Sequence, residues 1–138
     1  MTIPASLRRQ VVDRAGGRCE YCGLSQAGQE ARFHVDHVTP VAASGSTALE
    51  NLALARVSCS LRKGAREETV DPATGKLVRL FHPRRDAWLV HFAWDGLHVT
   101  GLTPVGRATI AALRMNRPLA LAIREEETHR HRHPPPAQ

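Results

Sequence analysis

An aspartate and two histidines lie close together in the sequence and offer groups that hydrolysis of a charged substrate needs. Asp36 and His37 are adjacent, and His34 precedes them. A carboxylate is a hard oxygen ligand for a divalent cation, and an imidazole can act as a base near neutral pH. Asn51 follows a Gly/Ser-containing segment, and its amide can hold that loop and fix an imidazole tautomer. Together these residues favour metal-dependent hydrolysis, although each one singly is also typical of an ordinary surface or core position.

Three cysteines offer a second kind of chemistry, metal binding by thiolates. Cys19 and Cys22 are spaced as in a zinc knuckle, whereas Cys59 has Arg56 instead of a thiol three positions before it. A guanidinium stays protonated and cannot bind a metal ion. Three interpretations remain open: small apolar core residues, a weak zinc site completed by water or a nearby histidine, or a vestigial site that has lost its metal.

The first half of the chain predicts the elements that must position these groups. A helix is expected over residues 4–15 and a strand over 31–38. A loop over residues 39–50 then leads to a second strand over 51–55 and a second helix over 59–66. On the first strand, His34 and Asp36 share one face, and His37 ends the strand at the mouth of the loop. The arginines of the first helix are expected on its solvent side: Arg8, Arg9 and Arg14.

The second half predicts a β-then-α extension. Strands are expected over residues 69–70, 77–81 and 88–94, and helices over residues 104–115 and 118–123. Asp95-Gly96 predicts a two-residue hairpin loop that pairs Phe92 with Val99 and leaves His91 and His98 on the other face. The end of the chain is rich in His, Arg and Pro, so we expect it to be disordered, with loose binding of metals or polyanions as an alternative.

Composition describes a small basic protein. The 138 residues, 42% of them hydrophobic, are enough to bury one core. The net charge of +6, with seventeen arginines, favours a polyanionic partner, although arginine usage can also reflect the base composition of a genome. No apolar run is long enough to cross a bilayer, and the N-terminus lacks the apolar stretch of a secretory signal. We therefore expect a cytoplasmic protein with no membrane partner.

The order and spacing of these residues are more specific than any one of them. Cys19-x-x-Cys22, then Asp36-His37, then Glu50-Asn51-Leu52, then Cys59 with a basic stretch after it resembles the HNH endonuclease family of ββα-metal nucleases. The resemblance covers residues 4–66, and the remainder looks like the C-terminal extension of one bacterial branch of that family. It implies an α+β fold: a ββα-metal core with an N-terminal helix and a C-terminal β-hairpin plus helices.

The resemblance also implies a role for each matching residue. His37 would be the general base that activates water, and Asn51 would orient the loop and His37. Asp36 would bind a catalytic Mg²⁺ or Mn²⁺. The shell of that ion would be completed by Ser60, His34 or His91. Basic side chains of the second helix would hold phosphates, or form only a solvated face: Arg62, Lys63 and Arg66. The structural Zn²⁺ site would be held by Cys19, Cys22 and Cys59.

Two departures from the family pattern weaken the expected activity. The second knuckle is normally Cys-x-x-Cys, so Arg56 leaves the Zn²⁺ site without its fourth ligand. Family members usually place His or Asn after the last cysteine as a metal ligand, and here that residue is Ser60. A neutral hydroxyl is a poor ligand and would act through a metal-bound water.

These observations predict three segments and one leading function. Residues 1–68 are expected to form an HNH nuclease-like domain with a partial zinc knuckle. Residues 69–124 would be a β-hairpin and helical extension packed on the same core, and residues 125–138 a disordered tail. The function is metal-dependent hydrolysis of phosphodiester bonds in nucleic acid, with DNA expected and RNA as an alternative. The rival is a catalytically impaired protein that uses the same scaffold to bind nucleic acid or to regulate. A plain protein-interaction domain is a third possibility.

Overall fold

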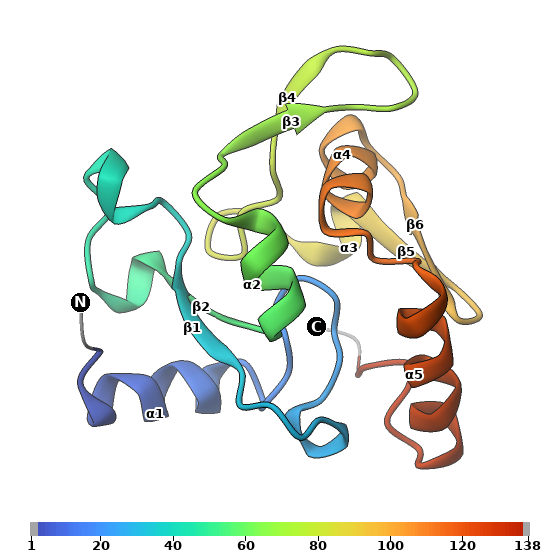
Figure 1. Cartoon of the computed structure of the whole chain (residues 1–138), viewed down its shortest axis with the longest axis horizontal. Coiled ribbons are helices and arrows are strands. Elements are labelled where there is room, and N and C mark those ends of the chain that lie inside the picture. The colour runs from blue at the N-terminus through green and yellow to red at the C-terminus, as the bar shows by residue number, and fades with distance from the viewer. Residues whose placement is uncertain (1–2, 137–138) are drawn as a thin grey trace. The chain divides into compact units, whose positions relative to one another are not determined.

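The computed structural model describes residues 3–136, which divide into two compact units. The first consists of the chain up to Ala65 together with His82–Arg85, and the second of Arg66–Phe81 together with the chain from Asp86 onward. The fold is α+β, as predicted, and its strands form small antiparallel hairpins (Figure 1). The segment boundaries at residues 68 and 124 and a shared core stay predictions. Within residues 3–136, no helix is both long and apolar enough to cross a membrane.

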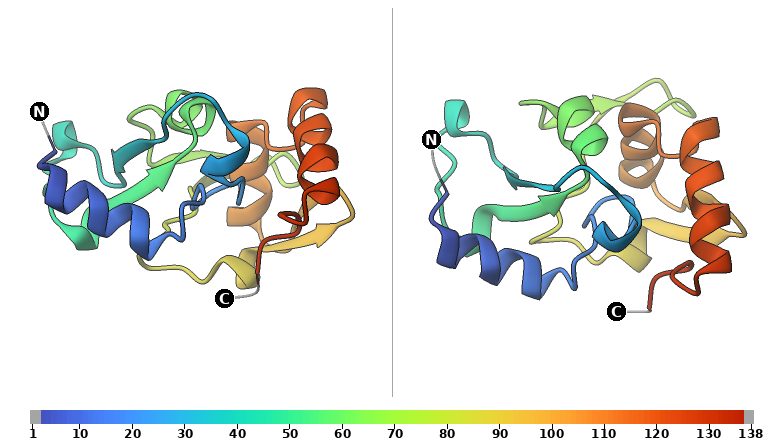
Figure 2. Two further views of the ribbon diagram at one scale, coloured as in Figure 1. Left: turned by 90° about the horizontal axis from the view of Figure 1, so that it is seen from below. Right: turned by 60° about the horizontal axis from the view of Figure 1, so that its bottom comes forward.

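The first unit is built around one hairpin. Strand β1 (His34–His37) pairs antiparallel with β2 (Leu52–Ala55), with His34 opposite Ala55 and His37 opposite Leu52. Helix α1 (Ala5–Arg14) packs on β2 and helix α2 (Val57–Lys63) on β1, so the hairpin lies between the two helices (Figures 1 and 2). Short 3₁₀ turns occupy Gln26–Gly28, Val41–Ala43 and Leu49–Asn51.

Burial explains why this hairpin forms the centre of the unit. All four residues of β2 are at most 2% exposed, because the strand is covered on both faces. Val11 of α1 and Phe33 before β1 add to the same core. Helix α1 is followed by Gly16 and Gly17, both with positive φ, which end it as the sequence predicts.

Two arginines of α1 differ from the expectation of a purely solvated face. Arg8 donates from Nη2 to the carbonyl of Phe33 at 2.7 Å. Arg14 donates to the carbonyls of Leu49 and Leu52 at 2.8 and 2.5 Å. Their long side chains reach backbone acceptors that the sequence pattern of a helix does not reveal, and they tie α1 to the hairpin.

The second unit combines two hairpins and two longer helices. Its elements are β3 (Glu68–Val70), β4 (Leu77–Arg79), α3 (Trp88–His91), β5 (Phe92–Asp95), β6 (His98–Gly101), α4 (Pro104–Leu113) and α5 (Pro118–His129). Helix α4 packs against β3, β4 and β6. Thr103 caps α4 by accepting a hydrogen bond from the Gly106 amide at 3.1 Å, as its sequence position predicts. Arg107 of α4 binds the buried carboxylate of Asp71 at 3.0 and 3.1 Å.

The predicted strand over residues 88–94 and its hairpin register are wrong. Residues 88–91 form the helical turn α3, which lets Trp88 stack on Trp94 with ring centroids 5.0 Å apart, so aromatic packing overrides the alternating pattern. In the hairpin, Asp95 pairs with His98 and Trp94 with Val99. The loop residues are therefore 96 and 97, because Gly96 takes the positive φ that the first turn position requires.

The disorder predicted from residue 125 is also wrong for the residues that the structure describes. Helix α5 continues to His129 instead of ending near residue 123. After it, the chain folds back, with Arg132 paired to the buried Glu127 at 2.8 Å and His133 Nε2 2.9 Å from the Gly96 carbonyl. These contacts order a segment whose composition alone resembles a solvated tail. Residues 137 and 138 lie outside the described residues.

Candidate metal centre and nuclease site

A carboxylate, a hydroxyl and an imidazole meet between β1 and α2. The Ser60 hydroxyl, on α2, donates to Asp36 Oδ1 at 2.8 Å, and His34 Nδ1 lies 2.9 Å from the same hydroxyl oxygen. His34 and Asp36 share one face of β1, as predicted, because side chains two residues apart on a strand point the same way. Three residues that the sequence places in the metal shell are therefore joined in one hydrogen-bonded cluster.

The hydrogen bonds of this cluster determine which His34 nitrogen carries a proton. An ionised carboxylate only accepts, so the single hydroxyl proton of Ser60 points to Asp36. The hydroxyl oxygen then accepts from His34 Nδ1, which must be the protonated nitrogen. In the neutral imidazole, Nε2 is left with a lone pair. Ser60 thus orients its two neighbours.

The donor atoms of this cluster are of the types that bind divalent cations. Within the described residues, no Lys, Arg or His nitrogen lies within 4.0 Å of an Asp36 carboxylate oxygen, so the cluster contains no ion pair. A carboxylate oxygen and an imidazole nitrogen with a lone pair are ligands that Mn²⁺ and related ions accept. Asp36 and His34 are the residues that would hold such an ion.

His37 stands apart from this cluster. It follows Asp36 on the strand, so its side chain leaves the opposite face, and its Nε2 lies 2.8 Å from Thr47 Oγ1 in the loop before β2. Among the described residues, the three cysteines alone form a group of His, Cys, Asp or Glu ligand atoms all within 4.8 Å of one another, so His37 does not join Asp36 and His34 in such a group. His91, the other predicted candidate ligand, lies in the second unit with Nδ1 2.6 Å from Thr103 Oγ1.

Asn51 holds the loop between the two strands, as the sequence predicts. Its amide donates to the carbonyls of Thr39 and Ser46 at 3.0 and 2.8 Å, and its carbonyl accepts from the Thr39 amide at 2.8 Å. Only 7% of Asn51 is exposed. The bonds of its side chain go to the loop backbone, so it positions the loop that carries Thr47 without bonding His37. Gly45 is required here because a Cβ would lie 1.8 Å from the Thr39 carbonyl oxygen.

The basic residues after Cys59 do not share one solvated face. Lys63 is 2% exposed and donates from Nζ to the Val38 carbonyl at 3.1 Å, so its side chain points inward and not to the solvated face. It lies on the inner face of a seven-residue helix whose end packs on the start of the loop. Arg62 is half-buried, and the exposed Arg66 already belongs to the second unit. A phosphate-binding role for Arg62, Lys63 and Arg66 stays a prediction.

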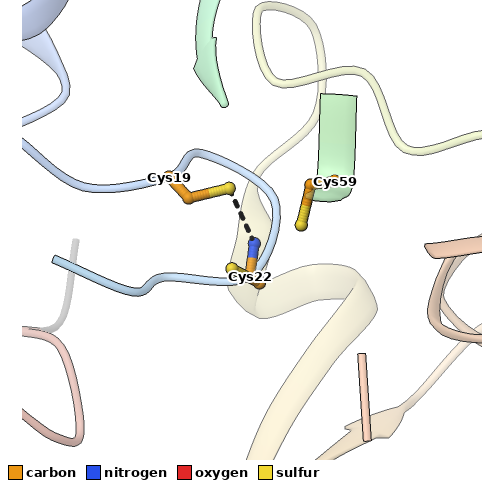
Figure 3. Close-up of side chains that lie close together, drawn as sticks. All are labelled: Cys19, Cys22 and Cys59. Carbon is orange, nitrogen blue, oxygen red and sulfur yellow. Dashed lines mark hydrogen bonds between the residues drawn. The ribbon is translucent and has the colours of Figure 1, made fainter. Parts of the chain in front are cut away.

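The three cysteines come together from two segments distant in the sequence. Cys19 and Cys22 lie in the tight turn after α1, Cys59 lies on α2, and their side chains gather around one point (Figure 3). Each is at most 3% exposed, and the sulfur atoms all lie within 4.8 Å of one another. Zinc bound tetrahedrally at about 2.3 Å places its sulfur ligands roughly 3.8 Å apart. The cysteines fit three of the four positions of such a site.

The pKa values of the cysteines in this cluster are shifted in different directions. Hydrogen bonds from Cys19 and Cys59 hold the pKa of Cys22 well below its usual value, and the positive charge of Arg56 acts in the same direction. Burial raises the pKa of Cys19 to about 12. Arg56, 9% exposed, sits at the N-terminal cap of α2, where the knuckle pattern expects the fourth cysteine. It neutralises thiolate charge but cannot supply the missing ligand.

Glu20, inside the knuckle, ties the cysteines to the central strand. Its backbone amide donates to the Leu54 carbonyl at 2.9 Å, and its side-chain Oε2 accepts from the Leu54 amide at 2.8 Å. Its other carboxylate oxygen pairs with Arg84, from the segment that returns to this unit. Sequence reasoning missed this residue because neither its spacing nor its type separates it from a surface glutamate.

Comparison with known proteins relates most of the first unit to one family. The model of the HNH endonuclease family matches residues 19–66, which run from Cys19 to just beyond α2. No curated protein and no solved structure matches the chain. The segment that holds the Asp36–Ser60–His34 cluster and the three cysteines therefore belongs to the HNH endonuclease family.

Proposed function

We propose that this protein is a metal-dependent endonuclease that hydrolyses phosphodiester bonds in nucleic acid, with DNA as the expected substrate. The observation that carries the proposal is the Asp36–Ser60–His34 cluster, in which a carboxylate without an ion pair and an imidazole are joined through one hydroxyl. Its place between β1 and α2 agrees with the ββα core of the family that residues 19–66 match.

Each residue of the cluster has a distinct task in this proposal. Asp36 and His34 would hold a Mg²⁺ or Mn²⁺ ion, and Ser60, which bonds both, would keep their side chains in position. The bound ion supplies positive charge that offsets the negative charge developing on the phosphate in the transition state. Ser60 replaces the stronger ligand of the family pattern, and we expect His34 to take over that function from the opposite element.

We propose His37 as the general base on the resemblance to the family alone, because its side chain leaves the face of β1 opposite to the Asp36–Ser60–His34 cluster. If Nε2–H donates to Thr47 Oγ1, the lone pair lies on Nδ1, and this atom takes the proton from the attacking water. Asn51 acts through Thr47, because it fixes the loop that carries the threonine. The residue therefore positions the base without contacting the substrate.

A structural Zn²⁺ ion is the second proposed metal. Cys19, Cys22 and Cys59 would hold it, and a water molecule would supply the fourth ligand in place of a cysteine at Arg56. The ion would cross-link the turn after α1 to α2, and so brace the helix that carries Ser60.

A catalytically impaired nucleic-acid-binding protein is the rival function. It is favoured by one observation: the hydroxyl of Ser60 is already engaged with Asp36 where the family usually has a stronger ligand. This rival predicts salt-sensitive binding of DNA without metal-dependent cleavage.

Nicking of supercoiled plasmid distinguishes the two functions. The wild type is incubated with Mg²⁺ or Mn²⁺ beside His37→Ala and the matched control His98→Ala, which changes an exposed histidine on β6. We expect nicking by the wild type and the control and its loss in His37→Ala. Absence of nicking together with a low-salt gel shift would support the rival, and equal nicking by His37→Ala would refute the role of the base.

A further inference from the structure

A cleft of about 470 Å³ opens on the first unit beside the Asp36–Ser60–His34 cluster. This cleft is shallow and open, and His34 and Asp36 are among the residues that line it, so we place the nucleic acid of the proposed reaction there. Two arginines, Arg8 from α1 and Arg32 from the segment before β1, line the same cleft. Residues of the N-terminal helix thus contribute to a site that the sequence pattern confines to later residues.

The position of Arg8 is fixed by the fold. Its Nη2 donates to the Phe33 carbonyl at 2.7 Å, which holds one edge of the guanidinium against the chain that also carries Arg32. Four further N–H donors of the group remain beyond that bond. Arg32 is exposed, whereas Arg8 is half-buried.

The two guanidinium groups are close enough for their charges to interact. Partial burial lowers the pKa of Arg8, and the neighbouring charge of Arg32 lowers it further. Within residues 3–136 neither arginine has a carboxylate oxygen within 4.0 Å. Two like charges placed together without an acidic partner repel each other. An anion bound between them offsets this electrostatic repulsion.

We propose that Arg8 and Arg32 form a binding subsite for a backbone phosphate of the nucleic acid, next to the phosphate that reacts. The inference rests on the proposed function, because it is the shared cleft with Asp36 and His34 that identifies the anion as part of a polynucleotide. Planar guanidinium groups bind phosphate oxygens in pairs. Their two positive charges also outweigh the single carboxylate of Asp36 in the cleft.

Binding of a fluorescein-labelled DNA duplex tests this subsite without any cleavage. Fluorescence anisotropy at several KCl concentrations, with no divalent metal added, compares the wild type with Arg32→Gln and with the matched control Arg9→Gln. Arg9 is exposed on α1 and does not line the cleft. We expect Arg32→Gln to weaken binding about tenfold at low salt and to reduce the slope of log K against log[KCl] by about one, with a clearly smaller effect of Arg9→Gln.

Equal effects of the two substitutions, or a wild type that binds no duplex, would overturn the subsite.

Arg8→Lys gives a second comparison, since it keeps the charge but loses the paired donors, and circular dichroism shows whether it folds. We expect it to weaken binding as well. The subsite and the nuclease activity fail separately: loss of plasmid nicking with an intact Arg32→Gln effect removes only the activity, and nicking with no Arg32→Gln effect removes only the subsite.

Discussion

Replacing Asn51 with alanine removes the side chain that holds the loop between β1 and β2. Three hydrogen bonds are lost, two to the carbonyls of Thr39 and Ser46 and one from the Thr39 amide. A net loss of about 1 kcal/mol per bond gives an upper figure of about 3 kcal/mol. Water can take over part of the lost hydrogen bonding, because Thr39 is half-buried and Ser46 is exposed. We therefore expect a loss of about 2–3 kcal/mol in the free energy of unfolding. For a chain of this size the melting temperature falls by about 6–15 °C.

Urea unfolding followed by far-ultraviolet circular dichroism measures this loss. Tryptophan fluorescence is less suitable, because both tryptophans, Trp88 and Trp94, lie in the second unit and Asn51 in the first. Ser46→Ala is the matched control, since it removes a hydroxyl but keeps the carbonyl that accepts from Asn51, and we expect a change of less than about 0.5 kcal/mol. If Asn51→Ala were as stable as this control, the side chain would not hold the loop, and its proposed link to His37 would be lost.

Three further substitutions test other parts of the structure. Gly45→Ala places a Cβ 1.8 Å from the Thr39 carbonyl oxygen, so we expect a loss of about 1–3 kcal/mol in unfolding measurements. Arg56→Cys completes the knuckle, so we expect elemental analysis to give one tightly held zinc per chain and the melting temperature to rise. Arg107 lowers the pKa of Asp71 to about 2, so the ionised pair stabilises the fold above about pH 4 and this contribution is lost as the pH falls through 2. At neutral pH we therefore expect Asp71→Asn to melt at a lower temperature than the wild type. The difference between the two melting temperatures should narrow between pH 4 and pH 2.

Each of these substitutions has a control within the chain. Ser46→Ala changes the neighbouring residue without adding a close Cβ, so a loss in it as large as that of Gly45→Ala would show that the close approach to Thr39 is not the cause. Arg66→Cys adds a thiol at an exposed position, and equal zinc gain in both cysteine variants would refute the knuckle geometry. Glu68→Gln removes an exposed carboxylate of β3, and the same pH response in it would point away from Asp71.

Much of the first unit follows from local sequence signals. The spacing Cys19-x-x-Cys22 predicts a tight turn that presents two thiols together, and Cys59 joins them in the structure. The alternation of strand side chains puts His34 and Asp36 on one face. The hydrogen bond from Ser60 to Asp36 joins residues 24 positions apart, and only the assumption of a ββα core could anticipate it.

Other features depend on contacts that no local pattern encodes. Lys63 is buried because the end of α2 meets the Val38 carbonyl, although a basic residue at a helix end usually faces solvent. The pattern of α1 does not distinguish Arg8 from Arg9, yet Arg8 alone reaches the Phe33 carbonyl and the cleft. In the second unit, the stacking of Trp88 on Trp94 converts an alternating segment into a helical turn.

Binding of Mn²⁺ to the intact protein tests most directly whether the cluster of Asp36, Ser60 and His34 is a metal site. Electron paramagnetic resonance of free Mn²⁺ counts the ions bound by the wild type and by Asp36→Asn, which keeps the size of the side chain and removes its charge. We expect one bound Mn²⁺ per wild-type chain, its loss in Asp36→Asn, and an unchanged zinc content in both. Equal binding of Mn²⁺ by the two proteins, or none by the wild type, would contradict it.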